Sequence, residues 1–123
     1  MTEQQHVDEM PRHLQDVYRE LRRCALKLGQ DVHVGANKDF IYFKSRLQFA
    51  HVEHMKRRGK LRVSVRHEVQ AVPAGHTRTF GTLSLERVPD SHRYSMATWF
   101  EIDSMGKLDD VEMLLRESYS AVS

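Results

Sequence analysis

The sequence has little cysteine and no long apolar run. Among its 123 residues Cys24 is the only cysteine, which excludes an intrachain disulfide and fits a reducing compartment. No stretch approaches the roughly 18 consecutive apolar residues that a membrane-spanning helix needs. The first residues have neither the basic segment nor the apolar segment of a secretory signal. These absences predict a cytoplasmic protein that does not bind a membrane.

The sequence also lacks the short motifs that accompany common chemistries. It contains no glycine loop of the GxxxxGK[ST] or GxGxxG type for phosphates, and no local signature that frames a serine nucleophile. His51 and His54 are three residues apart on a predicted strand, which points them to opposite faces and argues against a shared metal. Cys24 falls on the apolar stripe of a predicted helix, as an inert core thiol does. We therefore predict no catalytic residues, no metal and no cofactor, and a protein that is not an enzyme.

Length and composition indicate one globular domain. A chain of 123 residues has room for one core of ordinary size, and 40% hydrophobic with 29% charged residues is typical of a globular protein. We expect residues 1–123 to form a single domain, in which the polar residues 1–7 are disordered.

An amphipathic helix is predicted near each end of the chain. Between residues 8 and 28 apolar side chains recur at three- and four-residue intervals, with Asp8 as the N-cap, Pro11 in the first turn and Gly29 at the C′ position. Residues 108–122 show the same periodicity. The apolar stripe expected on this second helix consists of Leu108, Val111, Leu115, Ser118 or Tyr119, and Val122, widened by Met113 and Leu114.

Between the helices the pattern changes to the period of two that β-strands show. Leu61, Val63 and Val65 alternate with polar residues, so this strand has one buried face and one wet face. Further strands are expected at residues 31–35, 40–43, 47–55 and 94–102, and residues 78–88 fit either a strand or an extended loop. Turns are expected at residues 36–39 and 89–92. In the strand at 47–55 either face could be the buried one.

The order of these elements predicts the fold class. A helix, a meander of antiparallel strands and a second helix make an α+β fold, with about five to six strands and both helices packed on one face of the sheet.

The wet face of the strand at 60–66 and the turn before it are basic. Residues 31–67 hold nine Lys and Arg against three acidic residues, a net charge of +6, whereas residues 101–123 have a net charge of −4. Clustered Lys and Arg bind nucleic-acid phosphates, and an exposed aromatic ring adds base stacking. The candidate nucleic-acid contacts are Lys56, Arg57, Arg58, Lys60, Arg62, Arg66 and Tyr42. The alternative interpretation is a solvated hairpin whose charges deter edge pairing.

Three segments resemble a family of uncharacterised bacterial domains: DFIYFKS, LQFAHVEHMKRRGKLRVSVR and KLDDVEMLLRESYSAV. The family is labelled as predicted transport proteins, and its members are often appended to nuclease-like domains. The resemblance covers roughly residues 14–121, supports the α+β fold and implies no catalytic residues. Family members usually carry a Trp-Gly-containing stretch before the closing strand, whereas residues 90–94 of this chain contain no glycine.

Two classes of function are therefore expected. The first is a non-catalytic module that binds nucleic acid, or accompanies a nuclease-like protein, through the basic hairpin. The second is a protein-interaction or small-ligand domain that uses the groove between the helices and the sheet. An exposed edge strand would also permit a homodimer.

Overall fold

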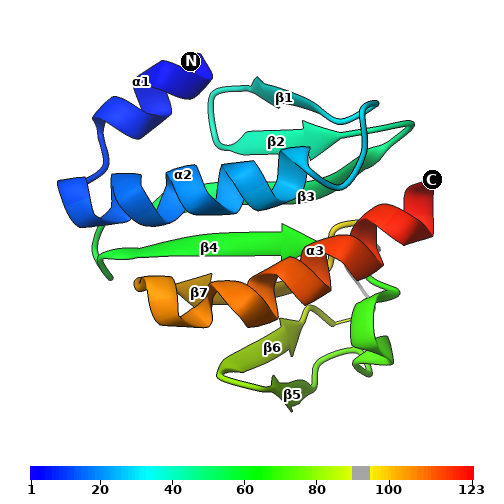
Figure 1. Cartoon of the computed structure of the whole chain (residues 1–123). Helices are drawn as coiled ribbons and strands as arrows, with labels where there is room; N and C mark the ends of the chain where they lie inside the picture. The colour runs from blue at the N-terminus through cyan, green and yellow to red at the C-terminus, as the bar shows by residue number, and fades with distance from the viewer. Residues whose placement is uncertain (90–94) are drawn as a thin grey trace.

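The computed structural model describes residues 1–89 and 95–123, which form one antiparallel sheet with helices packed on one face (Figure 1). The helices are α1 (Glu3–Asp8), α2 (Arg12–Leu26) and α3 (Leu108–Val122). The strands are β1 (His33–Ala36), β2 (Ile41–Lys44), β3 (Gln48–Met55), β4 (Lys60–Val65), β5 (Thr77–Phe80), β6 (Leu83–Arg87) and β7 (Thr98–Ile102). The predicted α+β class, with an antiparallel sheet and helices from both ends of the chain, is confirmed.

The sheet has seven strands in the order β1-β2-β3-β4-β7-β6-β5. Strands β1 to β4 form the predicted meander, but β4 then pairs with β7, so that Val63 lies opposite Phe100. From β4 the chain passes through a short 3-10 turn, Val69–Ala71, to the far edge of the sheet. Residues 78–88 were expected to form either a strand or an extended loop. They contribute to the β5–β6 hairpin.

The closing strand is shorter than the sequence suggests. Strand β7 begins at Thr98, whereas a strand over residues 94–102 was expected. Part of that expectation, and most of the turn expected at residues 89–92, falls on residues 90–94, which lie outside the described part of the chain.

The face of the sheet that meets the helices forms the core. Leu61, Val63 and Val65 are fully buried, as their alternation predicts. Helix α2 buries its apolar stripe against the sheet and against α3. None of the helices in residues 1–89 and 95–123 combines the length and the hydrophobicity needed to cross a bilayer.

Strand β3 contains an irregularity that bears on which of its faces is buried, a question that the sequence pattern left open. Phe43 pairs with Ala50 and Lys44 with Gln48, so Phe49 is the extra residue of a β-bulge. Phe49 is buried and meets Tyr119 of α3 edge to face, with ring centroids 5.4 Å apart. The bulge therefore turns Phe49 toward the helices, while His51 lies on the opposite face.

The prediction that residues 1–7 are disordered is wrong, because residues 3–8 form α1. Thr2 caps this helix in a reciprocal capping box with Gln5, and Val7 is buried. Glu3 accepts hydrogen bonds from Tyr18 and from Arg22 of α2, the latter at 2.8 Å. Burial and the contact with Glu3 raise the pKa of the Tyr18 hydroxyl. The polar N-terminal residues are ordered because Glu3 accepts hydrogen bonds from side chains of α2. A hydropathy pattern does not reveal such contacts.

The boundaries of the first predicted helix also need correction. Pro11 precedes α2 in an extended conformation, so the predicted helix over residues 8–28 is divided into α1 and α2. Gly29 does not have the left-handed backbone expected of a C′ residue. A Cβ at Gly29 would lie 2.2 Å from the hydroxyl of Tyr119, which donates to Asp31. Glycine at this position therefore makes room for α3.

Helix α3 has the bounds that its periodicity predicts, and it is attached to the sheet by a polar contact. Ser118 is fully buried; its Oγ donates to the carbonyl of Phe49 at 2.5 Å and accepts from the amide of Arg66 at 3.0 Å. Met113, expected to widen the apolar stripe, is 59% exposed, because it lies on the side of α3 that faces away from the core.

Candidate functional site

The sheet face opposite the helices, called the open face below, carries aromatic and imidazole side chains in one row. The register pairs Tyr42 with His51, His51 with Ser64, and Ser64 with Trp99. Because neighbouring strands are about 4.8 Å apart, Tyr42 and Trp99 are separated by roughly 14 Å along this row. All four residues are partly exposed. The helices of the described residues lie on the other side of the sheet (Figure 1).

Tyr42 is held against the edge of the sheet. A Cβ at Gly35 would come within 2.4 Å of the Tyr42 ring, so the ring rests on β1 where only glycine leaves room for it. Phe40 meets Tyr42 edge to face, with ring centroids 6.5 Å apart. The predicted site residue Tyr42 is therefore half-buried and fixed in position on the open face.

At the other end of the row, Arg62 lies over the ring of Trp99. The guanidinium carbon is 3.9 Å from the ring centroid, which is cation–π geometry. Arg62 Nη2 also donates to Glu101 Oε2 at 3.0 Å, and Arg58 pairs with the other carboxylate oxygen. The Glu101 side chain is only 8% exposed. The sequence pattern did not predict that Trp99 and Glu101 would meet Arg62 of β4.

The six predicted basic contacts do not form one bare positive patch. Arg58 and Arg62 pair with Glu101, Lys56 pairs with Glu9 at 3.2 Å, and Arg66 lies 3.6 Å from Glu68. Among the described residues, Arg57 and Lys60 form no ion pair. Exposed pairs such as Lys56 with Glu9 contribute about 0–1 kcal/mol, so a phosphate can compete for these cations. The basic residues are brought together, but most of them already contact a carboxylate.

His51 is a neutral imidazole at the centre of the row. Phe40 stacks on its ring with centroids 3.8 Å apart, and its Nε2 lies 2.6 Å from Gln48 Oε1. Burial lowers the pKa of His51 from 6.5 to about 4. Since the amide oxygen of Gln48 only accepts, the Nε2 of the neutral ring carries the proton and donates.

The stability of the domain is expected to fall as the pH drops from 6.5 toward 4, since unfolded His51 binds a proton that the folded imidazole rejects. The loss should approach about 1.4 kcal/mol per pH unit inside this window and be absent above it. Urea denaturation of wild type and His51→Phe between pH 7 and 5 measures it. The variant keeps an aromatic ring but should lose much less stability on acidification. His33→Phe, on the exposed part of β1, is the control; if it behaves like His51→Phe, the assignment to His51 is contradicted.

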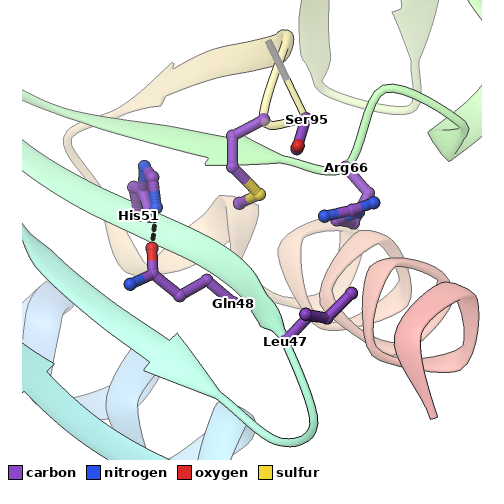
Figure 2. A pocket seen from close by; sticks show the side chains of 6 residues that line it. Leu47, Gln48, His51, Arg66 and Ser95 are labelled. Carbon is purple, nitrogen blue, oxygen red and sulfur yellow. Dashed lines mark hydrogen bonds between the residues drawn. The ribbon is translucent and has the colours of Figure 1, made fainter.

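A pocket of about 370 Å³ opens beside His51 (Figure 2). Its walls come from the start of β3, the end of β4 and the segment before β7. The lining residues are Leu47, Gln48, His51, Arg66, Ser95 and Met96. Apart from Arg66, none of the predicted site residues lines this pocket, because the segments that form it are far apart in the chain.

Other candidate chemistries find little support in the described residues. They contain no group of three His, Cys, Asp or Glu side chains that could hold a metal ion. His54 pairs with Leu61 in the register and so lies on the helix side of the sheet, opposite His51. Cys24 is half-buried, and burial raises the pKa of its thiol, which disfavours the nucleophilic thiolate.

Comparison with known proteins adds a family but no activity. A family model described as a domain of unknown function (DUF5655) matches residues 3–121. No curated protein and no solved structure shows a significant match to the chain.

Proposed function

The chain belongs to the DUF5655 family of domains of unknown function, and we propose that it is a non-catalytic binding domain that holds single-stranded nucleic acid on the open face of its sheet. The observation that supports this proposal is the row from Tyr42 through His51 to Trp99, which crosses four adjacent strands beside the basic residues of β4. We also propose that the domain accompanies a nuclease-like protein, as the domains that it resembles often do. We place it in the cytoplasm.

An antiparallel sheet with helices on one face and aromatic side chains on the other suits unpaired bases. Single-stranded nucleic acid is bound where bases stack on aromatic rings or on guanidinium planes while cations follow the backbone. Tyr42 and Trp99 supply the rings, and Arg62 supplies a guanidinium that already lies over the Trp99 ring. A duplex cannot offer its stacked bases to such a surface, so single strands are expected to bind better than duplexes.

The cations that remain for phosphates lie at the edge of this row. Arg57 is exposed at the β3–β4 turn, and Lys60 begins β4 on the open face. Lys60 also borders a polar hollow of about 240 Å³ that Lys107 and Trp99 share. Arg58 and Arg62 form ion pairs with Glu101. Their charge is therefore partly neutralised, and they contribute less to phosphate binding than Arg57 and Lys60 do.

Binding to a fluorescein-labelled oligonucleotide should be weak and without strong sequence preference, with a Kd of roughly 10⁻⁴ to 10⁻⁶ M at physiological salt. Affinity should fall steeply with salt. Replacing Arg57 and Lys60 by Gln should flatten the log–log salt slope by about 1.4, since each phosphate contact on a single strand contributes about 0.7. Trp99 is the only tryptophan of the chain, so its fluorescence should be quenched when bases stack near it.

The matched control removes two cations from the helices on the other side of the sheet. Lys27, which follows the last residue of α2, and Arg116 of α3 are both exposed, and their replacement by Gln removes the same formal charge. This variant should keep the wild-type salt slope. An equal change in both double variants, or no quenching of Trp99 at low salt with saturating oligonucleotide, would show that the open face does not bind nucleic acid.

A further inference from the structure

The pocket beside His51 contains a largely buried cation, Arg66, whose guanidinium forms no hydrogen bond with the described residues. The Arg66 side chain is 15% exposed, and its Nε is buried without a hydrogen bond. The carboxylate of Glu68 is 3.6 Å from Nε, which is too far for a hydrogen bond. No guanidinium nitrogen of Arg66 donates within residues 1–89 and 95–123, whereas Arg58, Arg62 and Arg87 all do. A buried donor in this state is costly unless a ligand satisfies it.

Apart from Arg66, the pocket is lined by the apolar Leu47 and Met96 and the uncharged polar Gln48, His51 and Ser95, and none of its described lining residues is a second cation. Leu47 and Met96 form its walls, and Leu47 is 45% exposed at the mouth. His51 faces Arg66 across the space but donates to Gln48 (Figure 2). The volume of about 370 Å³ falls at the small end of the range for small-molecule sites.

We propose that this pocket binds a small monocarboxylic acid, with the carboxylate on the guanidinium of Arg66 and an apolar body between Leu47 and Met96. Planar guanidinium and planar carboxylate match in a two-pronged hydrogen bond. The site offers one guanidinium, which already lies 3.6 Å from the Glu68 carboxylate, so the two charges of a phosphate monoester would be repelled more strongly than the single charge of a carboxylate. The proposal rests on the buried Arg66 Nε, which forms no hydrogen bond within the described residues, and it is independent of nucleic-acid binding.

Hexanoate is the probe, and hexanamide and hexyl phosphate are its neutral and doubly charged counterparts. Titration is followed by NMR at the Met96 methyl group and at the ring of His51. Hexanoate should saturate with a Kd of about 1 mM, as expected for a ligand of this size. Hexanamide and hexyl phosphate should each bind at least tenfold more weakly.

Two variants test the two ends of the pocket. Arg66→Gln removes the charge and should weaken hexanoate at least tenfold. Leu47→Asp changes an exposed residue at the mouth, which should not disturb folding, and should weaken hexanoate similarly through repulsion and lost apolar contact. Arg19→Gln, at an exposed site on α2 on the other side of the sheet, is the control and should bind as wild type does.

Equal binding of hexanoate and hexanamide by wild type would overturn the proposal, because the guanidinium would then play no part. Tighter binding of hexyl phosphate would overturn the carboxylate class. Absence of saturable shifts up to 20 mM hexanoate, about 20 times the expected Kd, would overturn the site itself. These three outcomes need no variant, so they remain decisive even if Arg66→Gln fails to fold.

Discussion

Replacing Val63 with aspartate is expected to unfold the domain. Val63 is fully buried at the centre of β4, and the register places it between Val52 of β3 and Phe100 of β7. A carboxylate there must either stay charged without a partner or take up a proton, and either costs several kcal/mol. A loss of this size is comparable with the roughly 5–15 kcal/mol that stabilise a whole domain. Circular dichroism during urea titration should show no cooperative transition.

Ser84→Asp introduces the same charge on the exposed side of β6 and is the control. Its effect on the free energy of unfolding should stay within about 0.5 kcal/mol. If both variants lost stability equally, the assignment of the buried and open faces would be wrong.

Replacing Ser118 with alanine is expected to cost about 2–4 kcal/mol although it removes a single oxygen atom. The hydroxyl joins α3 to the carbonyl of Phe49 and to the amide of Arg66. Alanine leaves both backbone groups without a partner, and each unsatisfied buried group costs about 1–3 kcal/mol. The urea midpoint should fall while the m-value stays unchanged, because the surface exposed on unfolding is the same.

Ser120→Ala lies two residues further along α3 on its exposed side. It should change the free energy of unfolding by no more than about 0.5 kcal/mol. A Ser118→Ala variant as stable as Ser120→Ala would mean that water satisfies the Phe49 carbonyl and that the hydroxyl is not needed.

Much of the fold could be predicted because it depends on local patterns. Alternation in β4 identified its buried residues, and helical periodicity gave the bounds of α3 (Leu108–Val122). The predicted turn before β2 is explained by Asn37, whose side chain accepts from the amides of Asp39 and Phe40. The pairing of β4 with β7 could not be predicted, because alternation states which residues are buried and not which strand lies alongside.

The candidate site was predicted less well, since a sequence shows which residues are charged but not which ion pairs they form. Arg58 and Arg62 were expected to be available for phosphates, but the register brings Glu101 opposite Arg62. The sequence left open which face of the strand at 47–55 is buried, because a bulge, which no residue type indicates, lets the consecutive residues Phe49 and Ala50 both be buried. The pocket beside Arg66 depends on three separate segments of chain, so only the folded structure assembles it.

The strand order also has a consequence for how the chain is made. During synthesis β1 to β4 can pair as soon as they emerge, since each is joined to the next by a short turn. The free edge of β4 must wait for β7, which follows 33 residues later and brings α3 behind it. Until then the apolar side of β4 lacks the cover that α3 provides and the backbone groups along its free edge are unpaired, the state in which nascent chains associate with one another. The nascent domain is therefore most prone to aggregate until the last quarter of the chain, which contains β7 and α3, has been synthesised.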